Sequence, residues 1–268
     1  MSILFDDYLA ELQLVPPEQP NLAFLNQFIT RHIASFSFNS VYSVLGKTMP
    51  LELEELLEKV VNQGMGGYCF EHNKIAFEFL RSLGYSTRLV VARVLNNQDR
   101  SAPRTHRFTV VELNQKSYLV DVGFGAACPI TAIEFGEVWQ RSGLDRYFIR
   151  EIENREFELV VEKEGGLFVL YRFDLANYSE ADCQVGHFYS HQHPDAVFVN
   201  NLVVSQKSAN EVCVLTNETL HTRSATQQTE QVMDTANKLH QVLTQQFKLN
   251  IEEDESRHLF ERCIATKL

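Results

Sequence analysis

The first third of the chain carries apolar residues three or four positions apart, which is the spacing of one face of an α-helix. Such a stripe predicts a helix over residues 21–36, after a proline-rich stretch that separates it from an earlier short helix. A second stripe over residues 50–61 predicts a helix with Pro50 in its first turn. A third helix is expected to start at Cys69 and to stop at Gly84, because glycine readily ends a helix.

After residue 85 the pattern changes to the β-branched, extended runs that are typical of strands. Strands are expected over residues 86–95, 106–113, 117–125, 196–206 and 210–223, with a hairpin over residues 156–175 turned at Gly165 and Gly166. An apolar stripe then predicts a further helix through Val232, Ala236, Leu239, Leu243 and Phe247. A short helix with an acidic start is expected over residues 252–263. Helices followed by antiparallel strands and a mixed end indicate an α+β fold with three parts.

Composition narrows the range of functions. The chain has 268 residues, 44% of them hydrophobic and 22% charged, as in ordinary globular proteins. Its net charge of −11 argues against a nucleic-acid surface, which needs a basic face. The longest apolar runs are too short to span a membrane, and the N-terminal segment lacks the basic start of a secretory signal. We therefore expect a cytoplasmic protein that binds neither nucleic acid nor membrane.

The five cysteines are odd in number and form no Cys-x-x-Cys pair, so reduced thiols are expected rather than disulfides. One of them, Cys69, follows the glycine-rich segment Gly-Met-Gly-Gly-Tyr and begins a predicted helix. A helix start carries partial positive charge and lowers the pKa of a thiol placed there. The glycines would let the backbone approach a substrate closely. The alternative reading of Cys69 is a small buried apolar residue beside an ordinary turn.

A base for this thiol can be placed by strand geometry. If Asn114 and Gln115 turn the hairpin between two predicted strands, paired residue numbers sum to 229. His106 and Asp121 sum to 227, which puts them one diagonal step apart on the same face. An Asp that orients a His, with the His available to a thiol, is the arrangement of a thiol acyltransferase or hydrolase. Taken singly, His106 could also be a surface strand residue, and Asp121 a residue that binds nearby backbone N–H groups.

Three segments, GGYCFEHN, PRTHRFTVVEL and YLVDVGFG, resemble the signature segments of the arylamine N-acetyltransferases in order and approximate spacing. The likeness extends over about residues 22–204. It implies a papain-like cysteine transferase with a helical bundle over residues 1–84 that carries the nucleophile and a β-barrel over residues 85–190 that carries the His and Asp. The remaining residues, 191–268, would form an α/β lid with a C-terminal helix.

The resemblance implies a nucleophile, a base and an orienting carboxylate, namely Cys69, His106 and Asp121. The reaction would be ping-pong transfer of acetyl from acetyl-CoA, through acetyl-cysteine, to an arylamine, arylhydroxylamine or hydrazine, in the metabolism of xenobiotics. No tightly bound cofactor is expected, and acetyl-CoA is a co-substrate. The oligomeric state stays open. Acceptor contacts are assigned to Phe38, Phe124, Phe198 and Tyr189. CoA contacts are assigned to Gly125, Ala126 and Arg104, with Arg107 and Lys207 as weaker candidates for its phosphates.

The chain departs from the family pattern at three places. Met65 stands where the family has Arg, Asn39 where it has Glu, and His187 with Phe188 where it has Asn-Trp. Losing both members of a buried ion pair together leaves no orphaned charge. We therefore expect Met65 and Asn39 to be neighbours, with the loop before Cys69 held by packing.

Other chemistries are open to the same residues. Cys69 with His72, or His187 with His191 and His193, could bind a metal, although neither has a second ligand cluster at a suitable spacing. Glu71 at the helix start favours a capping or salt-bridge role. The competing functions are an amide synthase of the same fold that acts on a tethered polyketide, a transglutaminase-like or peptidase-like thiol hydrolase, and a binding module with a decayed site.

Overall fold

The computed structural model describes residues 3–98 and 101–265. The first third is helical around a two-residue strand, with elements η1 Ile3–Phe5, α1 Asp6–Leu12, α2 Leu22–Ser35, β1 Phe38–Asn39, α3 Val41–Leu45, α4 Leu53–Leu57, η2 Glu58–Asn62 and α5 Cys69–Ser82. The helices predicted from Leu22 and from Cys69 are confirmed. Pro50 is not in a first turn, because α4 starts only at Leu53. The carbonyl of Met49, the residue before Pro50, accepts a hydrogen bond from His187. The predicted single helix is also continued by a π-helical turn, η2.

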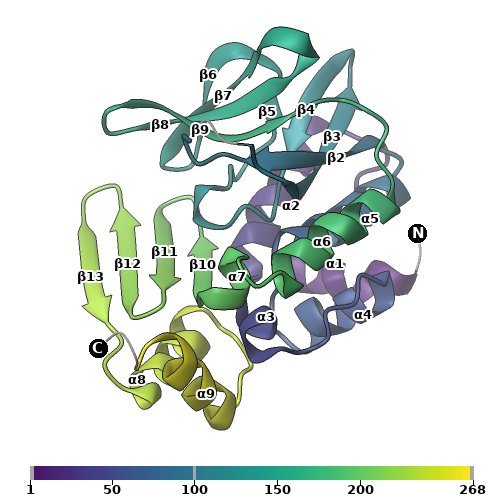
Figure 1. Cartoon of the computed structure of the whole chain (residues 1–268). Coiled ribbons are helices and arrows are strands. Elements are labelled where there is room, and N and C mark those ends of the chain that lie inside the picture. Colours follow the sequence, from purple (N-terminus) through teal and green to yellow (C-terminus); the bar gives the residue numbers. More distant parts are fainter. Residues whose placement is uncertain (1–2, 99–100, 266–268) are drawn as a thin grey trace.

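The middle of the chain forms a strongly curved antiparallel sheet (Figure 1). Among the described residues its strand order is β5-β4-β3-β2-β9-β8-β7-β6. The bounds are β2 Ser86–Val94, β3 Arg104–Leu113, β4 Lys116–Val120, η3 Gly125–Ala127, β5 Ile133–Glu134, β6 Gly136–Ser142, β7 Asp145–Glu151, η4 Glu153–Arg155, β8 Phe157–Lys163 and β9 Gly166–Phe173. Alternate side chains of these strands fill the barrel core, which includes Phe108, Leu159 and Tyr171. The helical start and this barrel confirm the predicted α+β class.

The predicted hairpin register is confirmed. Leu113 pairs with Lys116, and Thr109 with Val120. Asn114 and Gln115 have φ angles of 52° and 63°, the left-handed conformation at both positions that matches the twist of a two-residue hairpin. The β8–β9 hairpin is also confirmed. Its turn lies at Glu164 and Gly165, one residue earlier than predicted, since Lys163 pairs with Gly166.

The last third adds a second sheet with helices on one face. Its elements are α6 Glu180–Gln192, α7 Val197–Asn200, β10 Val203–Lys207, β11 Glu211–Thr216, β12 Thr219–Ser224, β13 Gln228–Val232, α8 Ala236–Gln241, η5 Val242–Gln246 and α9 Glu253–Cys263. Within the described part of the chain the sheet order is β1-β10-β11-β12-β13, so an N-terminal strand joins the C-terminal sheet. The boundaries proposed at residues 84 and 190 stay a prediction.

Two predictions for this region are wrong. Residues 197–200 form a helical turn rather than a strand, and Asn200 turns back to donate to the carbonyls of Pro194 and Ala196. Val232 ends strand β13 and is 42% exposed, so the helical stripe begins only after it. Helices α8 and α9 pack their apolar faces together through Leu239 and Leu259.

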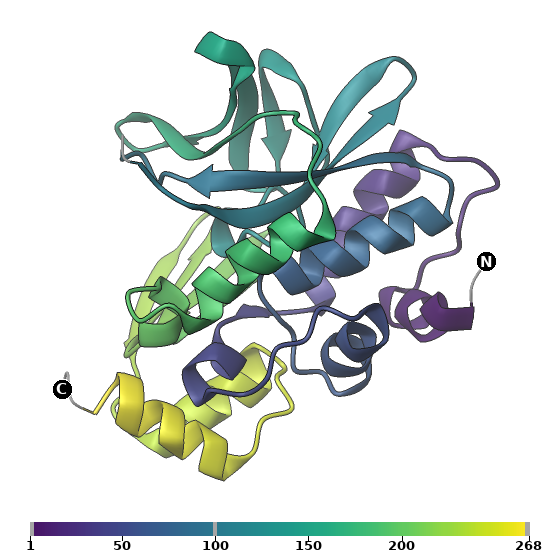
Figure 2. The same ribbon diagram turned by 45° about the vertical axis from the view of Figure 1, so that its right-hand side comes forward.

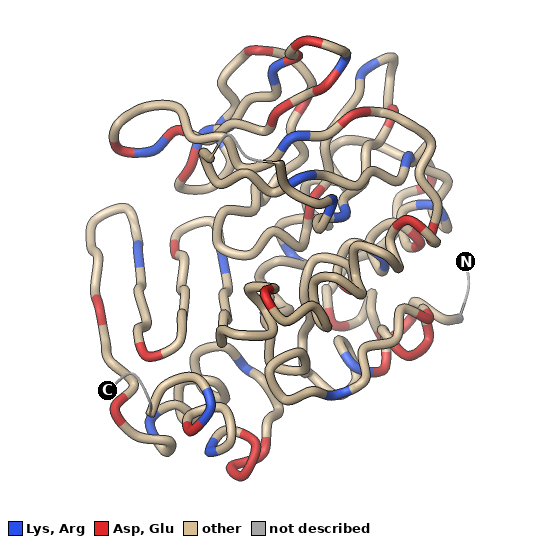
Figure 3. Tube along the Cα trace, viewed as in Figure 1, with Lys and Arg blue, Asp and Glu red and all other residues tan. Residues whose placement is uncertain are grey.

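Helices α5 and α6 run between the barrel and the rest of the molecule (Figure 2). Both contact strand β3, and Lys74 of α5 forms a salt bridge with Glu180 of α6. Acidic and basic residues are interspersed along the trace of the described chain (Figure 3). None of the helices in the described residues has the length and apolar character needed to cross a membrane.

Candidate active site

The thiol of Cys69 lies on the first residue of α5, where a buried carboxylate organises the helix start. Glu71 accepts a hydrogen bond from the backbone N–H of Tyr68 at 3.0 Å. Its other oxygen lies 2.6 Å from the ammonium of Lys59, and the side chains of Lys59 and Glu71 are 8% and 0% exposed. The ammonium also lies 4.0 Å from the centre of the Tyr42 ring. Both roles expected of Glu71 are confirmed, because it caps the helix start and forms a salt bridge with Lys59.

The glycines before Cys69 serve the fold of their own loop. Gly66 has a φ of +58°, and a Cβ atom there would lie 2.3 Å from the carbonyl oxygen of Ser37. Neither Gly66 nor Gly67 lines the cavity described below. The expectation that these glycines let the backbone approach a substrate is therefore wrong, because their missing side chains make room for residue 37 and for Glu71.

Met65 and Asn39, two of the departures from the family pattern, are neighbours as expected. The Asn39 side-chain amide donates to the Met65 carbonyl at 2.9 Å, and Asn39 Oδ1 accepts the Val41 N–H at 3.0 Å. Both residues are buried. The expectation that packing alone holds this loop is corrected, since a neutral hydrogen bond from Asn39 and the Lys59–Glu71 ion pair both hold it.

The predicted meeting of His106 and Asp121 is observed. His106 lies on β3 and Asp121 directly follows β4, and His106 Nε2 is 2.7 Å from Asp121 Oδ2. Their side chains are 1% and 0% exposed. Aromatic rings surround the imidazole, with the centres of the Phe124 and Tyr171 rings 4.8 and 4.9 Å from it. With Nε2 bound to the carboxylate, Nδ1 is the nitrogen left to exchange a proton with another group.

Further donors hold the Asp121 carboxylate, and the sequence reasoning missed them. Asn73 and the Gly123 N–H both donate to Oδ1 at 2.9 Å, and the Tyr171 hydroxyl donates to Oδ2 at 2.9 Å. Burial raises the pKa of Asp121, but the neighbouring His106 and the hydrogen bonds from Asn73 and Gly123 outweigh it, so the net shift is downward. Asn73 lies one helical turn after Cys69, a spacing that could have suggested its role. No local signal points to Tyr171, which comes from the distant strand β9.

Cys69 and His106 meet at one cavity, of about 560 Å³. The Cys69 thiol lies 3.6 Å from the carbonyl oxygen of Thr105, the residue before His106. Burial raises the pKa of Cys69, the charge of Asp121 raises it further, and backbone N–H groups of Arg107 and Phe70 lower it less. The lowered pKa expected from the helix start is thus wrong for this buried thiol, which must pass its proton to a base to become a nucleophile.

Most of the predicted binding residues line the same cavity. Its wall includes Phe38, Phe124, Gly125, Ala126, Tyr189 and Phe198. A larger open hollow of about 760 Å³, beside Phe157 on the barrel, contains none of these residues and neither Cys69 nor His106.

The predicted basic contacts lie elsewhere. Arg104 is not among the cavity-lining residues, and its guanidinium lies 2.5 Å from Asp174. The Arg107 side chain is fully buried and paired with Glu180 at 2.8 Å. Lys207 is fully buried and paired with Asp145 at 2.7 Å.

The histidines considered as metal ligands have other partners. His72 Nδ1 is 2.9 Å from His32 Nε2, and His187 Nε2 donates to the Met49 carbonyl. Burial lowers the pKa of His72 and that of His187 to about 4. Within the described residues no group of three or more His, Cys, Asp or Glu side chains has an arrangement that could hold a metal ion.

Comparison with known proteins identifies the family. Residues 21–256 match the N-acetyltransferase family profile. The arylamine N-acetyltransferase of Mycolicibacterium smegmatis is 30% identical over 213 residues, 76% of this chain and 77% of that protein. The Escherichia coli arylamine N-acetyltransferase is 28% identical over 208 residues, 76% of this chain and 73% of that protein.

Solved structures show the same fold. The arylamine N-acetyltransferase of Mycobacterium marinum superposes with a TM-score of 0.90 at 25% identity, over 96% of this chain and 99% of that one. A structure of that enzyme in complex with CoA gives a TM-score of 0.90 at 24% identity, with the same coverage. The resemblance inferred from the three signature segments is confirmed, and this chain is an acetyltransferase that belongs to the arylamine N-acetyltransferase family.

Proposed function

We propose that the protein transfers an acetyl group from acetyl-CoA to the nitrogen of an arylamine, arylhydroxylamine or hydrazine through an acetyl-Cys69 intermediate. The observation that carries the proposal is the convergence of three groups at one cavity. Cys69 and His106 both line it, and the buried Asp121 holds the far nitrogen of the imidazole. Acyl transfer through a thiol requires a nucleophile, a base and an orienting group, and these three residues can supply them.

The proton path follows from the hydrogen bonds. Asp121 keeps the proton of His106 on Nε2, so the lone pair of Nδ1 accepts the proton of the Cys69 thiol. The thiolate attacks the thioester carbonyl, and the CoA sulfur leaves with the proton that His106 returns. The acceptor amine then attacks the acetyl-cysteine and gives a proton to His106, which returns it to the leaving Cys69 sulfur. Burial raises the thiol pKa, so the thiol needs His106 as its base.

The cavity wall supports an aromatic acceptor. Three phenylalanines and Tyr189 contribute rings to a space large enough for a small aromatic amine. Among its described lining residues there is no Lys or Arg, and Asp195 is the acidic one. The phosphates of CoA would therefore lie outside this wall, with the thioester end of the molecule inside. The enzyme of Mycobacterium marinum that shares the fold has been solved with CoA, which supports CoA as the donor.

Steady-state kinetics with purified protein test the proposal. Acetyl-CoA and a panel of arylamines and hydrazines are varied together, and CoA release and N-acetyl product are both measured. We expect parallel double-reciprocal plots, the pattern of a ping-pong reaction, and no turnover by Cys69→Ala. A matched control, Cys213→Ala, removes a buried thiol outside the cavity lining and should keep its activity.

Other products would redirect the assignment. CoA release without amide formation would indicate a thiol hydrolase, and ammonia release from a glutamine peptide would indicate a transglutaminase-like activity. Acylation of Cys69 only by a carrier-tethered polyketide would favour the amide synthase. Turnover that survives Cys69→Ala would overturn the proposal. The assay includes a reducing agent, since all five cysteines are free and a reducing compartment such as the cytoplasm suits them.

A further inference from the structure

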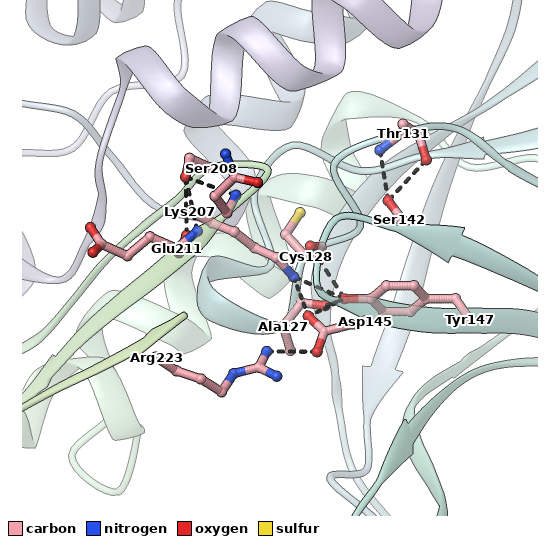
Figure 4. Close-up of polar contacts among 11 residues, drawn as sticks. Ala127, Cys128, Thr131, Ser142, Asp145, Tyr147, Lys207, Ser208, Glu211 and Arg223 are labelled. Atoms are coloured by element: carbon pink, nitrogen blue, oxygen red, sulfur yellow. Dashed lines mark hydrogen bonds and ion pairs between the residues drawn. The ribbon is translucent and has the colours of Figure 1, made fainter. Parts of the chain in front are cut away.

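A buried polar network joins the second sheet to the barrel, next to the cavity (Figure 4). Lys207, the last residue of β10, has a fully buried side chain whose ammonium lies 2.7 Å from Asp145 Oδ2 of β7. The other oxygen of Asp145 lies 2.6 Å from Arg223 of β12. The same ammonium donates to the hydroxyl oxygen of Tyr147 at 3.0 Å. Residues of three strands from two sheets therefore meet at Asp145, and the Lys207 ammonium links this group to Tyr147.

The Lys207 ammonium determines which acceptor receives the hydroxyl proton of Tyr147. The acceptors within reach are the Ala127 carbonyl at 3.1 Å, the Cys128 carbonyl at 3.4 Å and Asp145 Oδ2 at 3.4 Å. Lys207 already binds that oxygen of Asp145, so the phenol proton is directed to the carbonyl of Ala127. Burial and the neighbouring Asp145 raise the pKa of Tyr147 well above its ordinary value, so the phenol stays a donor.

The carbonyl that receives this proton belongs to the cavity wall. Ala127 ends η3, and all of Gly125–Ala127 line the cavity that holds Cys69. The next residue, Cys128, donates its thiol proton to the Asp121 carbonyl at 3.0 Å. The segment η3 is thus tied to the Asp121 backbone on one side and to Tyr147 on the other. In Figure 4 the side chains of Lys207 and Asp145 point at the Tyr147 hydroxyl, with Ala127 beside it.

We propose that Lys207 and Tyr147 are positioning residues that set η3 as a wall of the donor site and so determine the affinity for CoA. The inference rests on the proposed function, because it takes CoA as the donor. Without Lys207 the phenol would turn to the freed Asp145 oxygen, a stronger acceptor than a carbonyl, and η3 would lose its outer hydrogen bond. Neither residue lines the cavity, so both act through Ala127.

The experiment compares Tyr147→Phe, Lys207→Met and the double variant with the unchanged protein. Tyr118→Phe is the matched control, because it removes the same oxygen from another buried barrel tyrosine that does not line the cavity. The readouts are the Kd of CoA by titration calorimetry, and the KM for acetyl-CoA and kcat of acetyl transfer. Loss of one hydrogen bond to η3 should weaken CoA binding by roughly two- to tenfold.

Both single variants should raise Kd and KM together and leave kcat within about twofold, because Cys69 and His106 stand on α5 and β3. The double variant should bind CoA no more weakly than the weaker single variant, since both changes remove one bond. A Tyr147→Phe protein with the Kd and KM of Tyr118→Phe would overturn the inference, as would additive losses in the double variant.

The experiment distinguishes failure of this inference from misfolding of a variant and from failure of the proposed function. If Lys207→Met does not fold, the milder Tyr147→Phe decides the question alone. If the unchanged protein forms no acetyl-Cys69, the proposed function fails, and the Kd of CoA for the same variants still tests the role of η3. No measurable CoA binding by the unchanged protein would overturn both.

Discussion

Replacing Lys59 by Met tests what holds the start of α5. The Lys59 ammonium lies 2.6 Å from Glu71 Oε1 in a site where the two side chains are 8% and 0% exposed. Methionine has a similar volume and no charge, so the substitution leaves the packing nearly intact. Glu71 would then be a buried carboxylate with one oxygen bound to the Tyr68 N–H and the other without its cation.

The size of the effect follows from this burial. Removing one member of a buried ion pair typically costs about 3–5 kcal/mol, because the remaining charge stays in the interior. Glu71→Gln added to Lys59→Met removes that charge, and a glutamine at the third helical position still accepts the Tyr68 N–H as a capping residue. We therefore expect the double variant to recover at least about 2 kcal/mol of the free energy of unfolding lost by Lys59→Met.

Urea denaturation of the unchanged protein, both single variants and the double variant gives the four free energies of unfolding at pH 7.5. Lys59→Arg serves as the conservative control, because it keeps a cation at the site. A loss of less than about 1 kcal/mol for Lys59→Met, or losses that simply add in the double variant, would refute the reasoning. Such a result would mean that packing and the Asn39–Met65 hydrogen bond hold the loop before Cys69 without the ion pair.

Three further outcomes follow from the structure. The pKa of His72 and that of His187 are lowered to about 4 in the folded chain, so the unfolded chain takes up more protons below about pH 6.5. The free energy of unfolding should fall between pH 6.5 and 4 by about 3 kcal/mol per histidine, and a flat urea profile down to pH 4.5 would contradict this. Tyr171→Phe removes a donor to the Asp121 carboxylate and should lower kcat/KM at least about tenfold; unchanged kinetics would exclude that role. Arg104→Gln should change the KM for acetyl-CoA less than about twofold, since Arg104 binds Asp174, and a tenfold rise would restore it as a phosphate contact.

Local sequence patterns predict the parts of the site that depend on neighbours in the chain. The turn at Asn114 and Gln115 determines the register of β3 and β4, and this register brings His106 to Asp121. The start of α5 at Cys69 is likewise visible in the glycines before it and the apolar stripe after it. These features could be predicted because each depends on a few consecutive residues.

Features that depend on distant segments could not be predicted in this way. Helix α6 gives a weak apolar pattern, because its buried face is built from small residues such as Cys183, Gly186 and Ser190. A Cβ atom on Gly186 would lie 2.5 Å from the Arg104 carbonyl oxygen, so the close packing of α6 against β3 requires glycine at this position. Such small residues leave the helix without a recognisable apolar stripe. Tyr171 reaches Asp121 across 50 residues of sequence, and no local rule links the two.

The raised pKa of Cys69 has the same origin. A helix start favours a thiolate, but the folded chain buries the thiol and places the Asp121 charge near it, and these effects are larger. In the proposed reaction the thiol gives its proton to His106, which lies on β3 and not among the residues around Cys69.

Intact-mass spectrometry after mixing with acetyl-CoA tests the central claim most directly. The account predicts one added acetyl group of about 42 Da, located on Cys69 by peptide mapping, which disappears when an arylamine is added and N-acetyl product forms. His106→Asn should leave the thiol in place and strongly slow formation of the adduct. An acetyl group on another residue, or product formation with no adduct and no loss in Cys69→Ser, would contradict the account.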